Sequence, residues 1–368
     1  MDWNVAVTTA SKLVRPGPRV TYEEAAAVVA ELRQLAVQAD GHVRAFTRLS
    51  PLEAPPPVTV VDRPGWVEAN AGGFEALLEP LVQRLAERRP PAPLVQAVGS
   101  RVTGAEVGVL LAYLAGRVLG QYELFLPPGQ RQSEAETPAS EAAERRVSTG
   151  RLTLVAPNIV ATERALGVDP HDFRLWVCLH EVTHRTQFTA IPWLRDHLLA
   201  EITAFVDASD LDPGAVLKRL RSAAAEAAKS FRGRGEFNLI EVMQSPEQRV
   251  VLDRISAVMT LVEGHGEYVM DGVGPSVVPT VAEIRRRFDA RRHSAGGADR
   301  VIRRLLGIDM KIRQYVQGEK FVRTVVDAAG MDGFNRVWES AEMLPTKAEI
   351  TDPARWLARA DGRPAASA

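Results

Sequence analysis

The pentapeptide His180-Glu181-Val182-Thr183-His184 constrains this chain more than any other segment. Residues four apart on an α-helix lie one turn apart on the same face, so the two imidazoles can reach one ion. Glu181 follows the first histidine and can hold a water molecule on that ion. This H-E-x-x-H spacing is typical of zinc peptidases, in which the histidines bind zinc and the glutamate is the general base.

The local sequence predicts that the motif lies on a helix. Asp169 suits the N-cap, Pro170 the first helical position, and Asp172 the first turn, where the helix dipole favours a carboxylate. The mostly apolar run Phe173–Leu179 predicts that the helix is buried on most sides. A buried histidine or glutamate needs a polar partner, and a shared metal ion would satisfy all three. The alternative is a core helix with two hydrogen-bonded histidines and an ion-paired glutamate.

A hydrolytic zinc site usually has a third protein ligand, and the segment Leu261–Asp271 is the best candidate to supply it. The segment is acidic, contains a histidine, and has two glycines within a helix-like pattern, which predicts close packing of its backbone. We expect Glu263 to be the third ligand, with His265 and Glu267 as alternatives. The other interpretation is a buried helix whose acids pair with arginines elsewhere in the chain.

Further groups of the site are harder to choose from the sequence. Glu267 can hold His180 or His184 by the ring N–H that does not bind metal. His265, Tyr268 and Tyr315 are candidates for stabilising an oxyanion, and the sequence does not distinguish them.

The composition is that of a globular protein, with 368 residues, 46% hydrophobic and 25% charged. The net charge of -1 gives no global field that would recruit nucleic acid or acidic lipid. Cys178 is the only cysteine, so no intramolecular disulfide can form, as is typical of a reducing cytoplasm. The segment Met1–Asn4 begins no signal peptide, and the apolar run Val107–Leu119 is too short to span a bilayer. We therefore expect a cytoplasmic protein without a membrane partner, in an oligomeric state that the sequence leaves open.

A locally basic stretch between Arg285 and Arg304 is the one feature that suggests a nucleic-acid surface. It lacks interleaved aromatic residues, and the chain as a whole is nearly neutral. A solvated helix face with internal ion pairs is the favoured interpretation, so we expect no nucleic-acid partner.

The pattern along the chain predicts a mainly α-helical fold with a small β-sheet. Strands are expected at Val58–Val61, Tyr122–Leu126 and Arg151–Val155, the last two as a pair. Helices are expected over residues 21–38, 64–88, 103–120, 169–191, 193–206, 212–231, 245–271, 280–293 and 318–329, and one more from about residue 299. We expect a single domain over residues 1–358, with a mobile excursion at 127–150 and a disordered tail at 359–368.

Three local signals sharpen these expectations. Thr21 with Glu24, and Thr280 with Glu283, match the capping box that begins a helix. In the helix expected at 103–120, small residues recur at four-residue steps and predict close contact with another helix. These residues are Gly104, Gly108, Ala112, Gly116 and Gly120.

Together with the motif, several segments resemble a family of zincin-like hydrolases found in actinobacteria and related lineages, one branch of which is associated with biosynthesis of the deazaflavin redox cofactor. The segments are Val61–Val67, Ala156–Ile159, Cys178–His184, Glu263–Glu267, Gln314–Phe321 and Leu344–Thr346. The resemblance spans most of the chain. It implies a mainly helical fold with a zincin-like metallopeptidase core, and it does not imply a substrate.

These observations predict a zinc-dependent hydrolase of the peptidase type, acting on a peptide or small amide. Zn²⁺ is expected on His180, His184 and Glu263, with Glu181 as the general base. The alternative is a non-catalytic binding protein derived from a zincin, with a structural metal or none.

Overall fold

The computed structural model describes residues 1–88, 93–124, 126, 150–208, 245–293 and 308–362. These residues form a mainly helical fold with one small three-stranded sheet, which confirms the predicted fold class. By its internal contacts the chain divides into two compact units. The first comprises Met1–Pro192 and Val262–Val322, and the second comprises Trp193–Leu261 and Arg323–Ala368.

The first unit contains the sheet and most of the helices. Its elements are α1 (Trp3–Leu13), α2 (Tyr22–Thr47), β1 (Thr59–Val61), α3 (Arg63–Arg88), α4 (Pro93–Ala115), β2 (Gly120–Glu123), β3 (Arg151–Val155), α5 (Ala156–Leu166), α6 (Pro170–Ala190) and α11 (Val281–His293). Two longer helices, α10 (Pro246–Gly272) and α13 (Ile308–Asn335), each contribute residues to both units.

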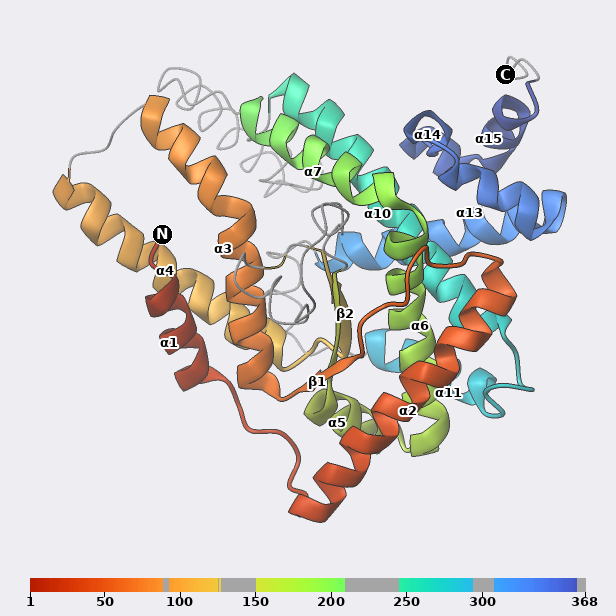
Figure 1. Ribbon diagram of the computed structural model, residues 1–368, viewed down its shortest axis with the longest axis horizontal. Coiled ribbons are helices and arrows are strands. Elements are labelled where there is room, and N and C mark those ends of the chain that lie inside the picture. The colour runs from red at the N-terminus through yellow and green to blue at the C-terminus, as the bar shows by residue number, and fades with distance from the viewer. Residues whose placement is uncertain (89–92, 125, 127–149, 209–244, 294–307, 363–368) are drawn as a thin grey trace, which may run out of the picture. The chain divides into compact units, whose positions relative to one another are not determined.

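The sheet has the strand order β1-β3-β2. The central strand, β3, pairs in parallel with β1 and antiparallel with β2, where Gly120 lies opposite Leu154 and Glu123 opposite Arg151. The pairing of the second and third expected strands is therefore confirmed. Helix α3 contacts β1 and β3, and α6 contacts β2 and β3, so the sheet lies between these two helices (Figure 1).

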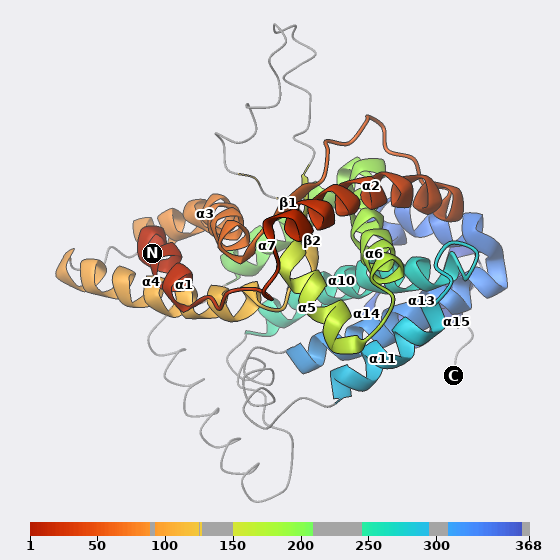
Figure 2. The same ribbon diagram turned by 90° about the horizontal axis from the view of Figure 1, so that it is seen from below.

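The core of the first unit lies where α2 packs against α6 (Figure 2). On α2 the buried positions recur every three or four residues, through Leu32, Leu35 and Ala39 to Val43 and Thr47. This stripe explains why α2 extends beyond the expected end at residue 38.

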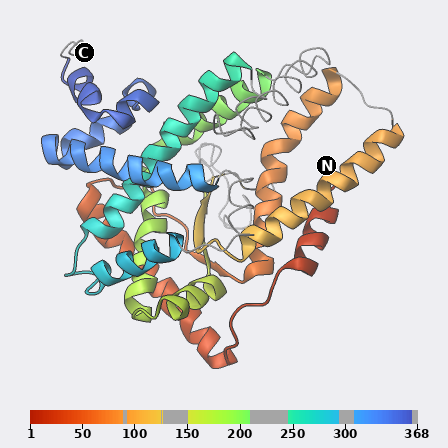
Figure 3. The same cartoon turned by 180° about the vertical axis from the view of Figure 1, so that it is seen from behind.

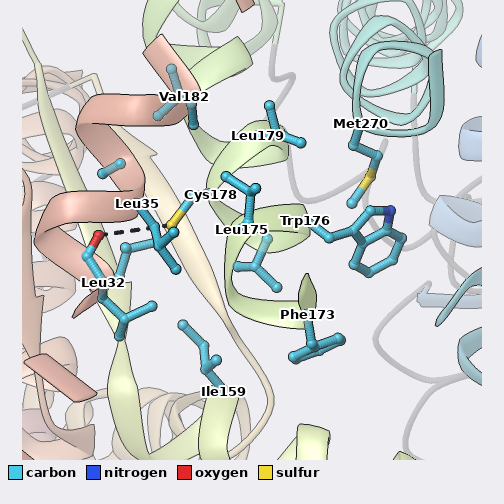
Figure 4. Packing of buried hydrophobic residues seen from close by; sticks show 14 of the residues in the cluster. Leu32, Leu35, Ile159, Phe173, Leu175, Trp176, Cys178, Leu179, Val182 and Met270 are labelled. Atoms are coloured by element: carbon cyan, nitrogen blue, oxygen red, sulfur yellow. Dashed lines mark hydrogen bonds between the residues drawn. The ribbon is translucent and has the colours of Figure 1, made fainter. Parts of the chain in front are cut away.

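Helix α6 is buried on most of its surface, as its apolar sequence predicts. In Figure 4, Phe173, Trp176 and Leu179 of α6 lie among the buried apolar side chains, and Cys178 faces Leu32 of α2. Burial raises the pKa of the Cys178 thiol, so this residue is a small core side chain and not a thiolate ligand.

Helices α1 and α4 lie side by side (Figure 3), and the small-residue stripe is the reason. A Cβ on Gly104 would lie 2.4 Å from the carbonyl oxygen of Asp2, and one on Gly108 would lie 2.6 Å from that of Ala6. The expectation that the stripe continues through a helix to residue 120 is wrong. Helix α4 ends at Ala115, and Gly120 is the first residue of β2, because the chain around it pairs with β3.

The N-terminal caps predicted from the sequence are confirmed at the starts of α2 and α6 but not at that of α11. Thr21 and Glu24 form the expected capping box at α2, and Asp169 accepts a hydrogen bond from the backbone N–H of Asp172 at α6. At α11 the partner of Thr280 differs from the expected Glu283. The backbone N–H and the hydroxyl of Thr280 both donate to Oδ2 of Asp172, at 2.8 and 2.6 Å.

The second unit contains most of α7 (Pro192–Asp207), parts of α10 and α13, two short 3-10 helices, α14 (Lys347–Thr351) and α15 (Pro353–Ala360). Two tryptophan side chains connect its segments: Trp193 donates to the carbonyl oxygen of Trp338, and Trp356 donates to that of Met343. The tail from residue 359 was expected to be disordered. In the structure Arg359 belongs to α15, and its guanidinium binds Glu349 at 2.7 Å.

Several expectations fall on residues outside the described ranges. These are the excursion at 127–149, the helices expected at 212–231 and from about 299, the remaining tail at 363–368, and the arginines at 300, 303 and 304. The single-domain organisation also stays a prediction. Among the described helices, none has the length and apolar character needed to cross a membrane.

Candidate metal centre

Helix α6 brings the two motif histidines together within one turn. Nε2 of His180 and Nε2 of His184 are 3.0 Å apart, and the two rings meet edge to face with their centroids 4.5 Å apart. The helix begins at the Asp169 cap and is held by its apolar flank, so the core of the fold fixes the direction in which both rings point.

Helix α10 brings Glu263 to the same point. Oε2 of Glu263 lies 3.7 Å from Nε2 of His180 and 3.5 Å from Nε2 of His184. The side chains are only 16%, 11% and 12% exposed for His180, His184 and Glu263. Of the three candidates for a third ligand, Glu263 is therefore the one that the fold places beside the motif. These three residues form the group whose ligand atoms all lie within 4.8 Å of one another.

The spacing of these atoms fits a metal ion of zinc's size. A tetrahedral ion bonded at about 2.0–2.2 Å requires its donors to be about 3.3–3.6 Å apart, and the observed separations of 3.0, 3.5 and 3.7 Å span that range. Two imidazole nitrogens and one carboxylate oxygen are also a donor set found in zinc sites.

The two glycines within the Leu261–Asp271 segment of α10 each have a structural reason at the site. A Cβ on Gly266 would lie 3.1 Å from the His180 ring and 3.2 Å from that of His184, so the glycine leaves room for both rings. A Cβ on Gly264 would lie 2.1 Å from the carbonyl carbon of Gly318 on α13. The two backbones therefore cross in close contact, which supports α10 at the turn that carries Glu263.

Glu181 is buried beside β2. The residue is 6% exposed, and a Cβ on Gly120 would lie 2.7 Å from Cγ and 2.8 Å from Cδ of Glu181. The absence of a side chain at Gly120 thus makes the space in which the Glu181 carboxyl lies. The negative charge of Glu181 is also close enough to His184 to act on its pKa.

Burial disfavours the charged form of His184, but the hydrogen bond and charge of Glu263, together with the charge of Glu181, raise its pKa to about 9. Binding of a metal ion at Nε2 would therefore release a proton at neutral pH. Burial and the nearby His184 lower the pKa of His265 to about 3, so that ring is neutral at neutral pH.

The remaining residues singled out in this segment lie elsewhere. His265 is fully buried on α10, and its Nδ1 contacts Nε2 of Gln187 at 3.0 Å. Glu267 binds Arg285 of α11, and its contact with a ligand histidine stays a prediction. Tyr268 lies against the ring of Phe46, with centroids 5.7 Å apart. The side chain of Tyr315 is outside the described residues.

The alternative interpretation of this segment was that its acids pair with arginines. This pairing is present for Glu267 and Asp271. Arg285 binds both Glu267 and Asp271, and its guanidinium lies 5.1 Å from the ring centroid of Trp176. Arg287 on the same basic helix donates to the carbonyl oxygen of Leu166 at 2.7 Å. These arginines are thus engaged within the protein, as expected of internal ion pairs.

The sequence analysis missed a buried glutamine of the site. Gln187 lies on α6 one turn after His184 and is fully buried, and its Oε1 contacts Nδ1 of His184 at 3.0 Å. The available signal was its position three residues after the second histidine, on the same helix face.

Two of three comparisons with known proteins found a match. A crystal structure from Chloroflexus aurantiacus, described as a proposed hydrolase with a novel fold, shares 29% identity with this chain, covers 99% of it and 100% of its own length, and superposes with a TM-score of 0.67. A search of curated proteins found no match. The model of the zincin-like metallopeptidase family matches residues 1–357. The chain therefore belongs to the zincin-like metallopeptidase family.

Proposed function

We propose that this protein is a zinc-dependent peptidase in which His180, His184 and Glu263 bind the metal. The observation that carries the proposal is the spacing of their three donor atoms, on two helices fixed by the core. A zinc ion bound there would supply a water molecule with a pKa near neutrality and polarise the carbonyl of a substrate. In this proposal the three ligands would hold that water molecule next to Glu181.

Glu181 acts as the general base in this proposal. Its carboxylate takes a proton from the attacking water and delivers it to the leaving amine. Its position next to His180 in sequence and against Gly120 in space holds it at the junction of α6 and β2. Because Glu181 is buried, bulk water has little access to its carboxylate.

Strand β2 supports a peptide as the substrate. The backbone N–H of Val155 donates to the carbonyl oxygen of Leu119, so these two residues form a hydrogen-bonded pair. In an antiparallel pair of strands such positions alternate, so the backbone N–H and C=O groups of Gly120 and Tyr122 point away from β3. In the described part of the chain β2 is an edge strand. An extended peptide that paired with this edge would pass Gly120, and therefore Glu181.

A pocket of about 220 Å³ lies between the same strand and α3. Its polar side chains already have partners within the fold: Asn70 donates to the carbonyl oxygen of Trp66, Gln121 accepts from the indole of Trp66, and Glu123 binds Arg151. The lining is mainly apolar, with Phe74 and Leu77 contributed by α3. It therefore suits an apolar side chain of a peptide bound along β2.

Removal of the metal is the first test of this function. We expect the protein to cleave peptides from a mixture of varied sequences, to lose this activity after dialysis against a strong chelator, and to regain it with one equivalent of zinc. Cleavage is followed by mass spectrometry of the mixture. A chelated protein that retained full activity, with its metal content measured as zero, would contradict the proposal.

Gly120→Ala provides a second, more local test. The added Cβ forces the flexible Glu181 side chain to move, and a displacement of about 1 Å in a catalytic group can cost about 100-fold in rate. We expect a loss of that order in kcat with zinc content unchanged. Gly116→Ala is the matched control, because a Cβ there meets nothing within 4 Å. Equal activity of the two variants would show that the space at Gly120 does not serve Glu181.

A further inference from the structure

Gln187 connects the two helices that carry the candidate metal ligands. From α6 its Nε2 lies 3.0 Å from the carbonyl oxygen of Val262 and 3.0 Å from Nδ1 of His265, both on α10. Its Oε1 lies 3.0 Å from Nδ1 of His184. Gln187 and His265 are both fully buried, where each polar contact must be well matched.

The backbone carbonyl of Val262 determines the orientation of this amide. A carbonyl oxygen can only accept, so the Gln187 nitrogen must face it and the Gln187 oxygen must face His184. Because that oxygen carries no hydrogen, Nδ1 of His184 must hold the proton of this contact. The second N–H of the amide points to Nδ1 of His265, which therefore accepts.

The consequence for His184 is that Nε2 is the nitrogen left to bind an ion. This nitrogen faces His180 and Glu263, at 3.0 and 3.5 Å. The same amide also holds the carbonyl of Val262, the residue directly before Glu263. One side chain thus fixes the proton of one ligand and the backbone position of another.

We propose that Gln187 is the positioning residue of the metal centre: it holds His184 in the tautomer and orientation that present Nε2 to the ion, and His265 anchors Gln187. The inference rests on the proposed zinc site and goes beyond it. It assigns His265 the role of a buried hydrogen-bond acceptor behind the ligands, in place of the ligand or oxyanion role considered from the sequence.

Zinc affinity of a Gln187→Met variant tests this role. Methionine preserves the length and bulk of the side chain but removes the donor and the amide oxygen. Loss of such a partner weakens metal binding by about 10–100-fold, and we expect that loss in competition with a chromophoric chelator. Thr186→Val is the matched control. Thr186 is also buried on the same turn, and within the described ranges its hydroxyl bonds to the carbonyl oxygen of Val182 alone, so zinc affinity should be unchanged.

The outcomes separate this inference from the proposed function. A wild-type protein that bound no zinc would overturn the metal centre and the inference with it. A Gln187→Met variant with wild-type zinc affinity would overturn the inference alone.

A measurement on the zinc-loaded wild-type chain avoids any dependence on the folding of a variant. Nitrogen-15 NMR of the imidazoles should show His184 protonated at Nδ1 and bound to metal through Nε2, and His265 protonated at Nε2. Metal binding through Nδ1 of His184, or a proton on Nδ1 of His265, would rule out the proposed arrangement.

Discussion

Glu181→Gln is expected to abolish peptide hydrolysis while leaving zinc bound. Glutamine has nearly the same shape and fits the space beside Gly120, but its amide cannot take a proton from water at neutral pH. General base catalysis contributes about 10²–10⁴-fold to rate, so a loss of kcat of at least that size is predicted. The metal ligands are not altered, and the zinc affinity should stay within a few-fold of the wild-type value.

The measurement pairs turnover with metal content on the same preparation. Cleavage of a peptide substrate gives kcat, and elemental analysis gives zinc per chain. A variant that kept its zinc and turned over at the wild-type rate would show that another group takes the proton. A variant that lost its zinc would place Glu181 among the groups needed for metal binding.

Glu263→Gln is expected to have the second largest effect, on zinc affinity. A neutral amide oxygen is a much weaker ligand for zinc than a carboxylate, and the change also removes the charge that faces His180 and His184. Loss of a hydrogen-bond partner behind a ligand already costs about 10–100-fold, so loss of a ligand should cost about 100-fold or more. Zinc affinity is measured by competition with a chelator.

Glu267→Gln is the matched control on the same helix. Glu267 lies one turn after Glu263 and binds Arg285. Weakening this buried ion pair should lower the thermal stability without changing the zinc affinity of the folded protein. If Glu267→Gln lowered the zinc affinity and Glu263→Gln left it unchanged, Glu267 and not Glu263 would be the third ligand.

The motif helix could be predicted from the sequence because its determinants are local. The cap at Asp169, the proline at the first position and the apolar run that follows all lie within a few residues of the motif. Strands β1 and β3 were found for the same reason, since each is a short run of β-favouring residues, whereas β2 overlaps its expected range only at Tyr122 and Glu123.

The choice of the third ligand depends on how two helices pack, and the sequence could only narrow it. Glu263, His265 and Glu267 lie within five positions of one helix, and its rotation decides which of them faces the histidines. That rotation follows from close contacts at Gly264 and Gly266, whose partners are far away in the chain. The glycines signalled close packing but not its direction.

Gln187 and Gly120 could not be assigned because neither belongs to a motif with a recognised spacing. The role of Gln187 depends on the carbonyl of Val262, and that of Gly120 on the position of Glu181 across a helix–strand contact. Gly120 was also placed in a helix from its four-residue spacing. The pairing of β2 with β3 prevailed over that local pattern.

X-ray diffraction at the zinc absorption edge, from crystals of protein purified without added metal and then given one equivalent of zinc, tests the three-residue site most directly. We predict one anomalous peak at about 2.0–2.2 Å from Nε2 of His180, Nε2 of His184 and a carboxylate oxygen of Glu263. A structure with no zinc between these residues, and with both rings bonded only to protein groups, would contradict the account.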